Sequence, residues 1–189
     1  VAAGRALVRL NTGSDAGDRV ALVLDAAPER QRFDAEARIA SPANGLVTGA
    51  LGLRRPLAAT ITGDGDWRQW QGSAAARLGG DLLADLRLAA GSGRYALSGQ
   101  VRPSLLKSGK IGRLTAPAVR VAGEAGFADR RIDGTLRLDS PALAVRAAGV
   151  VDLGAGTFAP VRIDARLRQP RALFPNMTGE NIRLAVTLT

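Results

Sequence analysis

The stretch Val161-Arg162-Ile163-Asp164-Ala165-Arg166-Leu167-Arg168 alternates apolar and charged residues without a break. Consecutive side chains of a β-strand point to opposite faces, so this spacing places the four apolar residues on one face and the four charged residues on the other. On an α-helix the same charges would surround the helix on all sides. The stretch therefore predicts a β-strand with one apolar face and one charged face.

The same period of two recurs along the chain, and short turn signals separate the runs. Further alternating runs lie at 32–39, 94–102, 132–139 and 182–188. The turn signals, rich in Gly, Pro, Asn, Asp and Ser, lie at 41–45, 63–66, 91–93, 140–141 and 154–156. Strands joined in this way predict an all-β fold, a long curled antiparallel meander of about thirteen strands that encloses a groove. The segment 170–179 lacks the alternation and contains Pro175, so we expect a turn of helix or an irregular connection there.

A weak internal repeat accompanies the alternation. Gly49, Gly99 and Gly149 are 50 residues apart, and each follows a strand end. We expect each glycine to lie in the middle of a strand, where it would let the sheet bend. The expected array is one segment, 1–189, with units at about 1–55, 56–105, 106–155 and 156–189. The alternative is a chance match, because the chain contains 23 glycines.

Composition removes most catalytic chemistry. The 189 residues include no cysteine and no histidine, so thiolate nucleophiles, disulfides, imidazole bases and the usual zinc sites are excluded. Apolar residues make up 46% of the chain but aromatic residues only 4%, which favours thin layers over a core of large rings. We expect no enzymatic activity, no cofactor and no metal. Val1 already begins a strand-like pattern, so we expect the chain to be part of a longer protein.

The net charge of +9 invites a nucleic-acid interpretation, but the pattern does not favour it. The basic residues are spread evenly, and Lys107 and Lys110 are the only lysines. Stacking on bases needs aromatic residues among the basic ones, whereas Phe33, Tyr95, Phe127 and Phe158 fall on the apolar positions. We therefore expect no nucleic-acid partner.

Two local motifs have simpler structural explanations. Gly63-Asp64-Gly65-Asp66 resembles the start of a calcium loop, but the downstream ligands are missing, and a hairpin turn explains it better. Trp67 and Trp70 flank this turn, so packing at the turn is expected, with an aromatic platform as the alternative. Neighbouring carboxylates, such as Asp34 and Glu36, share a face with arginines, which predicts solvated cross-strand ion pairs.

The apolar face is the feature that carries functional content, because an amphipathic sheet must cover it with protein or with a ligand. The sequence predicts no helix that could cover it. A sheet curled with this face inward would form a groove for acyl chains. The residues expected to line it are Val20, Leu22, Leu24, Phe33, Ile39, Val47, Leu51, Leu86, Leu88, Tyr95, Leu97, Val101, Phe127, Ile132, Leu136, Leu138, Leu143, Val145, Val151, Val161, Ile163, Leu167, Leu184 and Val186.

Three stretches give the chain a resemblance to a known family. The run from Ile132 to Leu153, the Trp67-x-x-Trp70-x-Gly72 turn and the run from Gly93 to Val101 resemble repeats of the TamB family (translocation and assembly module) of the AsmA-like superfamily. The resemblance covers essentially the whole chain but rests on repeat phrasing without an invariant motif.

This resemblance implies a bridge-like lipid-transfer protein in the periplasm of a Gram-negative bacterium. It implies an inner-membrane anchor through an N-terminal helix, a hydrophobic groove that carries phospholipid acyl chains, and an outer-membrane barrel partner of the TamA type that supports outer-membrane biogenesis. The anchoring helix and the barrel-binding segment have no counterpart in these 189 residues. Two alternatives remain open, a structural or adhesive β-solenoid of a secreted protein and, on net charge alone, a β protein that binds nucleic acid.

Overall fold

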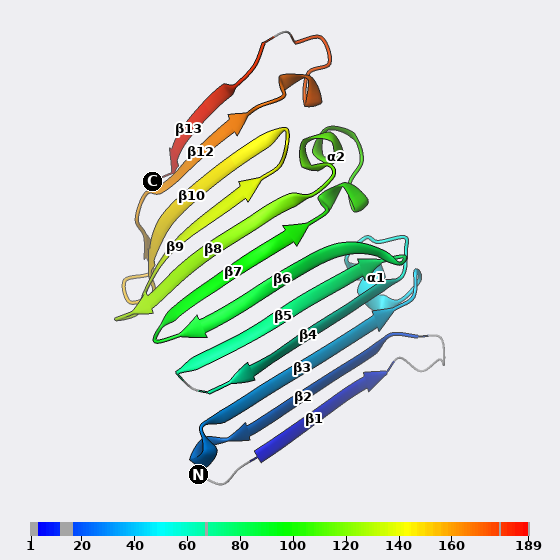
Figure 1. The fold of residues 1–189 in the computed structure, drawn as a ribbon, viewed down its shortest axis with the longest axis vertical. Helices are drawn as coiled ribbons and strands as arrows, with labels where there is room; N and C mark the ends of the chain where they lie inside the picture. Colours follow the sequence, from blue (N-terminus) through cyan, green and yellow to red (C-terminus); the bar gives the residue numbers. More distant parts are fainter. Residues whose placement is uncertain (1–3, 12–16, 67, 178, 189) are drawn as a thin grey trace. The chain divides into compact units, whose positions relative to one another are not determined.

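A computed structural model describes residues 4–11, 17–66, 68–177 and 179–188 (Figure 1). The chain divides into two compact units, which meet between Ser92 and Gly93 in the sequence. Both units are antiparallel meanders, so the all-β fold class expected from the sequence is confirmed. The repeat of about 50 residues stays a prediction.

The first unit is a six-stranded sheet in which each strand pairs with the next along the chain. The 3-10 helix η1 (Pro28–Arg30) joins the second strand to the third, and the α-helix α1 (Leu46–Ala50) lies between the third and the fourth. The strands are β1 (Gly4–Asn11), β2 (Arg19–Ala27), β3 (Arg32–Ser41), β4 (Leu57–Gly65), β5 (Gln69–Leu78) and β6 (Asp81–Gly91).

The second unit repeats this plan with its own connections. The 3-10 helix η2 (Pro103–Leu105) and the α-helix α2 (Gly109–Thr115) follow its first strand, and the 3-10 helix η3 (Pro170–Ala172) precedes its last. The strands are β7 (Arg94–Val101), β8 (Val119–Ala128), β9 (Arg131–Asp139), β10 (Leu143–Asp152), β12 (Val161–Leu167) and β13 (Ile182–Leu188), while the two-residue β11 (Thr157–Phe158) pairs with β10.

The strand register turns the sequence alternation into two different sheet faces. Ile163 of β12 lies opposite Ala147 of β10 and Val186 of β13, whereas the next residue, Asp164, lies opposite Arg146 and Ala185. The other pairings keep this phase, except that the register between β5 and β6 shifts after Ala76, so apolar residues collect on one face and charged residues on the other.

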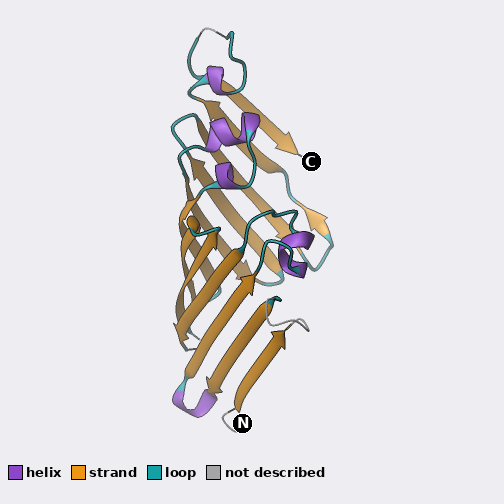
Figure 2. Cartoon of the chain, turned by 90° about the vertical axis from the view of Figure 1, so that its right-hand side faces the viewer, coloured by secondary structure: helices purple, strands orange, loops and turns teal. Residues whose placement is uncertain are grey.

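The buried core of each unit lies at one end of its strands. In the first unit Leu57 and Leu78 are opposite each other and buried, close to the end where α1 connects β3 to β4. In the second unit Val119, Ala142 and Leu167 are buried at the end that carries η2, α2 and η3. Figure 2 shows these helical segments beside the strand ends. We call this the closed end of each unit.

One sequence expectation about this end is wrong. Gly49 lies inside α1, not in the middle of a strand, so Val47 also belongs to the helix and Leu51 is its C-terminal cap. Gly99 and Gly149 do lie within strands, in β7 and β10. The expectation that the chain has no helix at the apolar face fails for the same reason.

The physical cause of this difference is a contact from far along the chain. The Asp18 carboxylate accepts hydrogen bonds from the first amides of α1, Leu46 N at 2.5 Å and Val47 N at 3.2 Å. These amides would otherwise have no partner within the helix. Local alternation over 47–51 could not reveal this acceptor, which lies 28 and 29 residues earlier in the chain.

The 170–179 segment follows its expectation more closely. It begins with η3 and continues as turns, which agrees with a turn of helix there. The expected hairpin at 63–66 is also present, since β4 and β5 pair antiparallel on either side of it.

Candidate functional site: an apolar sheet face closed at one end

The apolar face of the second unit runs across six strands. Its members follow from the register, because each lies opposite another member on the neighbouring strand. At the strand positions that the structure describes there, all side chains on this face are apolar or glycine. They are Tyr95, Leu97, Gly99, Val101, Val119, Val121, Gly123, Ala125, Phe127, Ile132, Gly134, Leu136, Leu138, Leu143, Val145, Ala147, Gly149, Val151, Val161, Ile163, Ala165, Leu167, Ile182, Leu184, Val186 and Leu188.

The first unit has an equivalent apolar face with smaller side chains. Val20, Leu22 and Leu24 of β2 lie opposite Ile39, Ala37 and Ala35 of β3. On β4, β5 and β6 the face continues through Leu57, Ala59, Ile61, Gly63, Trp70, Gly72, Ala74, Ala76, Leu78, Ala84, Leu86, Leu88 and Ala90.

Exposure of this face increases from the closed end to the other end on β7, β8 and β12, whereas the last strand, β13, is exposed along its whole length. In the second unit Val119 and Leu167, at the closed end, are 6% and 8% exposed. Tyr95 and Phe127, at the opposite end, are 52% and 45% exposed. Soluble domains rarely leave an apolar surface of this extent uncovered unless it binds something. We call the end of the strands opposite the closed end the open end.

A buried polar cluster holds the closed end of the first unit together. Ser41, on the apolar face of β3, donates its hydroxyl hydrogen bond to Asp18. Thr48 of α1 is fully buried; its hydroxyl donates to Pro42 O at 2.6 Å, and its amide donates to Ser41 Oγ at 3.2 Å. The Ser41 hydroxyl, followed by the Leu46 and Val47 amides, lowers the pKa of the Asp18 carboxyl. These contacts fasten α1 over this end of the face.

A second set of contacts holds the closed end of the other unit. The Ser140 hydroxyl donates to Leu114 O of α2 at 2.6 Å, which ties the helix to the β9–β10 turn. Arg168 donates to both carboxylate oxygens of Asp139, at 3.1 and 2.7 Å, and to Ser140 O at 2.9 Å. The hydrogen bond from Arg168 lowers the pKa of the Asp139 carboxyl.

Trp70 fills the shallowest part of the first unit's apolar face. Gly63 and Gly72 lie opposite each other on β4 and β5, and a Cβ at either would collide with the Trp70 ring. The ring thus covers a pair of glycines, a packing that restores the contacts they lack. The indole Nε1 is buried without a hydrogen-bond partner. This position agrees with packing beside the turn, while Trp67 lies outside the described residues.

The turn beside Trp70 is held by a single carboxylate. Asp66 Oδ1 accepts from the Arg68 and Gln69 amides, both at 2.6 Å, which lowers the pKa of the Asp66 carboxyl. No group of three residues suited to a metal ion occurs among the residues that the structure describes. The contacts of Asp66 agree with the hairpin turn expected at the Gly-Asp motif.

The charged face carries ion pairs, with one difference from expectation. Asp34 and Glu36 do pair with arginines, but with Arg32 and Arg38 two residues away on the same strand instead of across strands. Such exposed pairs contribute little to stability.

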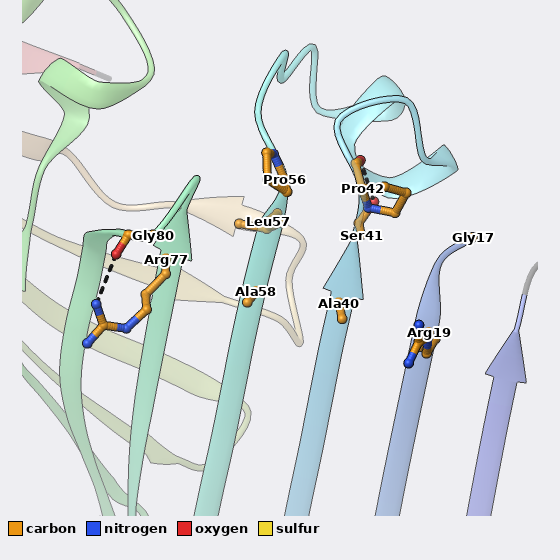
Figure 3. Close-up of a pocket in the computed structure, with 10 residues that line it drawn as sticks. All are labelled: Gly17, Arg19, Ala40, Ser41, Pro42, Pro56, Leu57, Ala58, Arg77 and Gly80. Carbon is orange, nitrogen blue, oxygen red and sulfur yellow. Dashed lines mark hydrogen bonds between the residues drawn. The ribbon is translucent and has the colours of Figure 1, made fainter. Parts of the chain in front are cut away.

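A shallow hollow lies on the charged face of the first unit (Figure 3). It has a volume of about 470 Å³ and lies over the row Arg19, Ala40, Ala58 and Arg77, whose members are opposite one another on β2 to β5. The Arg77 guanidinium donates to Gly80 O at 3.0 Å. Among the lining residues, Ser41 carries the only hydroxyl, and this hydroxyl donates to Asp18.

Twenty-two of the residues expected to line a groove occupy the apolar face of their unit. The two exceptions are Val47 and Leu51, and Leu51 is 61% exposed. The interpretation missed other residues on the same face, including Leu57, Ile61, Trp70, Val119 and Val121, although the period of two was present to find them. It also missed the cluster at Asp18, for which the sequence has no periodic signal.

Comparison with known proteins does not assign this fold to a family. No protein-family model matches the chain, and neither the curated proteins nor the solved structures contain a match. Within the described residues, no helix has the length and apolar character needed to cross a membrane.

Proposed function

We propose that this chain is a periplasmic segment of a bridge-like lipid-transfer protein whose apolar sheet faces shield phospholipid acyl chains on their way to the outer membrane. The parent protein would be anchored in the inner membrane and would act with an outer-membrane barrel of the TamA type. The observation that carries the proposal is the apolar face of the second unit, which spans six strands with no charged residue at its strand positions.

The energetics of such a face suit an acyl chain. Each methylene that moves from water onto an apolar surface contributes about 0.8 kcal/mol when fully shielded. Six strands about 4.8 Å apart give a face of about 24 Å across in each unit. A chain of many methylenes can therefore be shielded without any specific contact.

The side chains on the face also suit movement along it. Deep polar pockets would hold one ligand at one place, because an unpaired polar group in an apolar site must find its partner. Alanine, glycine, valine and leucine dominate the face, so neighbouring positions offer an acyl chain nearly the same environment. The lipid headgroup would remain in water at the open end, beside residues such as Tyr95 and Phe127, which are half exposed.

Photo-crosslinking in cells tests the proposal with matched pairs of positions. A photoreactive amino acid at Leu97 or Ile163 of the apolar face should capture phospholipid. The same amino acid at Ser98 or Arg162, one residue further or earlier on the same strand but on the other face, should capture little.

Two outcomes would contradict lipid shielding. Equal labelling of both members of a pair would mean that the faces do not differ in lipid access. Adducts with protein alone at the apolar positions would favour the structural or adhesive β-solenoid, whose apolar side chains are sealed in a protein core.

A further inference from the structure

The two helical connections of the second unit lie together at its closed end. The Arg113 guanidinium Nε donates to Ala172 O at 2.9 Å, which joins α2 to η3. Lys110 Nζ lies 5.7 Å from the centre of the Phe174 ring. Through Ser140 the same connection is attached to the sheet. These segments therefore form one surface, although they are about 60 residues apart in the chain.

The charge on this surface is predominantly positive, and Glu180 is the exposed acid at the far end of the connection between η3 and β13. It carries the exposed cations Lys107, Lys110, Arg113 and Arg171, and the segments 102–118 and 168–179 contain no aspartate or glutamate. Both lysines of the chain are here. Among the described residues, none of these four cations forms an ion pair, in contrast with Arg168.

Exposed apolar side chains lie among these cations. Leu106, Ile111 and Phe174 are 44%, 52% and 48% exposed. These three side chains are not required to pack α2 on the sheet. The side of α2 that faces the sheet presents Gly112, which is buried, and Leu114, which is half buried. We call these three residues and the four cations the basic rim.

Cations mixed with exposed Leu, Ile and Phe side chains are typical of surfaces that lie on anionic membranes. The cations meet phosphate groups, and the apolar side chains enter the boundary between headgroups and acyl chains. A nucleic acid would meet the same charges, but it offers no place for exposed Leu106 and Ile111, and Phe174 is the single aromatic residue of the rim. An anionic bilayer is complementary to both features.

We propose that the basic rim docks the second unit on the surface of an anionic phospholipid bilayer. The docking surface uses the connections at the strand ends, not the apolar sheet face, so it does not depend on acyl chains lying on that face. Lys107 and Lys110 bind headgroup phosphates, and Ile111 inserts beside them.

Vesicle co-sedimentation with the full chain tests the proposal. The protein should bind vesicles that contain phosphatidylglycerol and should bind vesicles of phosphatidylcholine alone much more weakly, with the difference shrinking as salt rises. Each cation near an anionic surface contributes about fivefold to binding, so Lys107→Gln combined with Lys110→Gln should weaken it about 25-fold. Lys107→Arg with Lys110→Arg should restore it.

A control variant separates the rim from general charge attraction. Arg94→Gln combined with Arg162→Gln removes the same charge from exposed positions on the polar sheet face. It should lower binding far less than the lysine pair. Ile111→Ser should weaken binding at high salt as well as at low salt, because apolar insertion is not screened.

Three outcomes would overturn the docking surface. The unmodified chain could fail to bind phosphatidylglycerol vesicles, or the two double variants could lose binding equally, which would leave only net charge. The lysine variant could also keep vesicle binding but lose lipid labelling at Leu97, which would assign the rim to headgroups of carried lipids. If the chain with an unchanged rim shows no lipid labelling at Leu97 but still binds vesicles through the rim, the result would count against the proposed function alone.

Discussion

Leu78→Ala measures how much of the first unit depends on its closed end. Leu78 is 2% exposed and lies opposite Leu57, which is 9% exposed, at the end of the sheet closed by α1. Removing three carbon atoms from this position forfeits about 2.4 kcal/mol of transfer free energy at about 0.8 kcal/mol per methylene. The cavity that remains adds to this loss, so a total of about 2–5 kcal/mol is expected.

The matched control is Leu51→Ala. Leu51 caps α1 close to the same end, but it is 61% exposed, so its truncation should change the free energy of unfolding by less than about 0.5 kcal/mol. Urea denaturation followed by circular dichroism gives both values from the midpoint and the slope.

The comparison also decides between the two descriptions of this segment. If 47–51 were a strand with Leu51 facing inward, truncation of Leu51 would cost as much as truncation of Leu78. Equal losses would therefore refute both the helix and the closed end as the core of the unit. A loss at Leu78 below about 1 kcal/mol would mean that this end is not tightly packed.

Three further changes test other parts of the arrangement. The folded state lowers the pKa of Asp18, so its contribution to stability is complete above the ordinary value of 3.8 and is lost as pH falls below it. As pH is lowered, the unfolding midpoint should therefore fall more steeply for the unmodified chain than for Asp18→Asn. Parallel curves would mean that the Asp18 carboxylate does not stabilise the closed end. Trp70→Phe keeps a ring over Gly63 and Gly72 and removes a buried N–H that has no partner, so it should cost less than about 1 kcal/mol, whereas Trp70→Ala should cost about 2–3 kcal/mol. Similar denaturation midpoints for these two Trp70 variants would show that the ring does not support the sheet. Leu97→Asp should abolish lipid capture by a photoreactive residue at Ile163, whereas Arg94→Ala should leave it unchanged, and equal effects would mean that the faces are wrongly assigned.

The closed and open ends also separate structural from functional roles on one face. Leu167 and Val119 are buried by protein, so changes there act on folding, while Tyr95 and Phe127 are half exposed and free to meet a ligand. Variants at the open end are therefore better probes of binding than variants at the closed end.

The sequence by itself determined most of the strands and, within them, the side to which each residue points, although it wrongly predicted a strand around Gly49. Alternation is a property of neighbouring residues, and the pleat of a strand converts it into two faces without help from the rest of the chain. For this reason Ile163 and Arg162, or Leu136 and Arg137, could be assigned to opposite faces from a single stretch.

Only the tertiary structure decided where the face is covered and by what. The carboxylate of Asp18 accepts hydrogen bonds from the first amides of the helix at Leu46–Ala50, and the contact of Arg113 with Ala172 joins the two connections of the basic rim. Neither contact leaves a periodic trace, since the partners are 28 to 59 residues apart and join segments that have no regular alternation. Periodicity indicates the face to which a side chain points. Whether that face is covered depends on which distant segment of the chain packs against it.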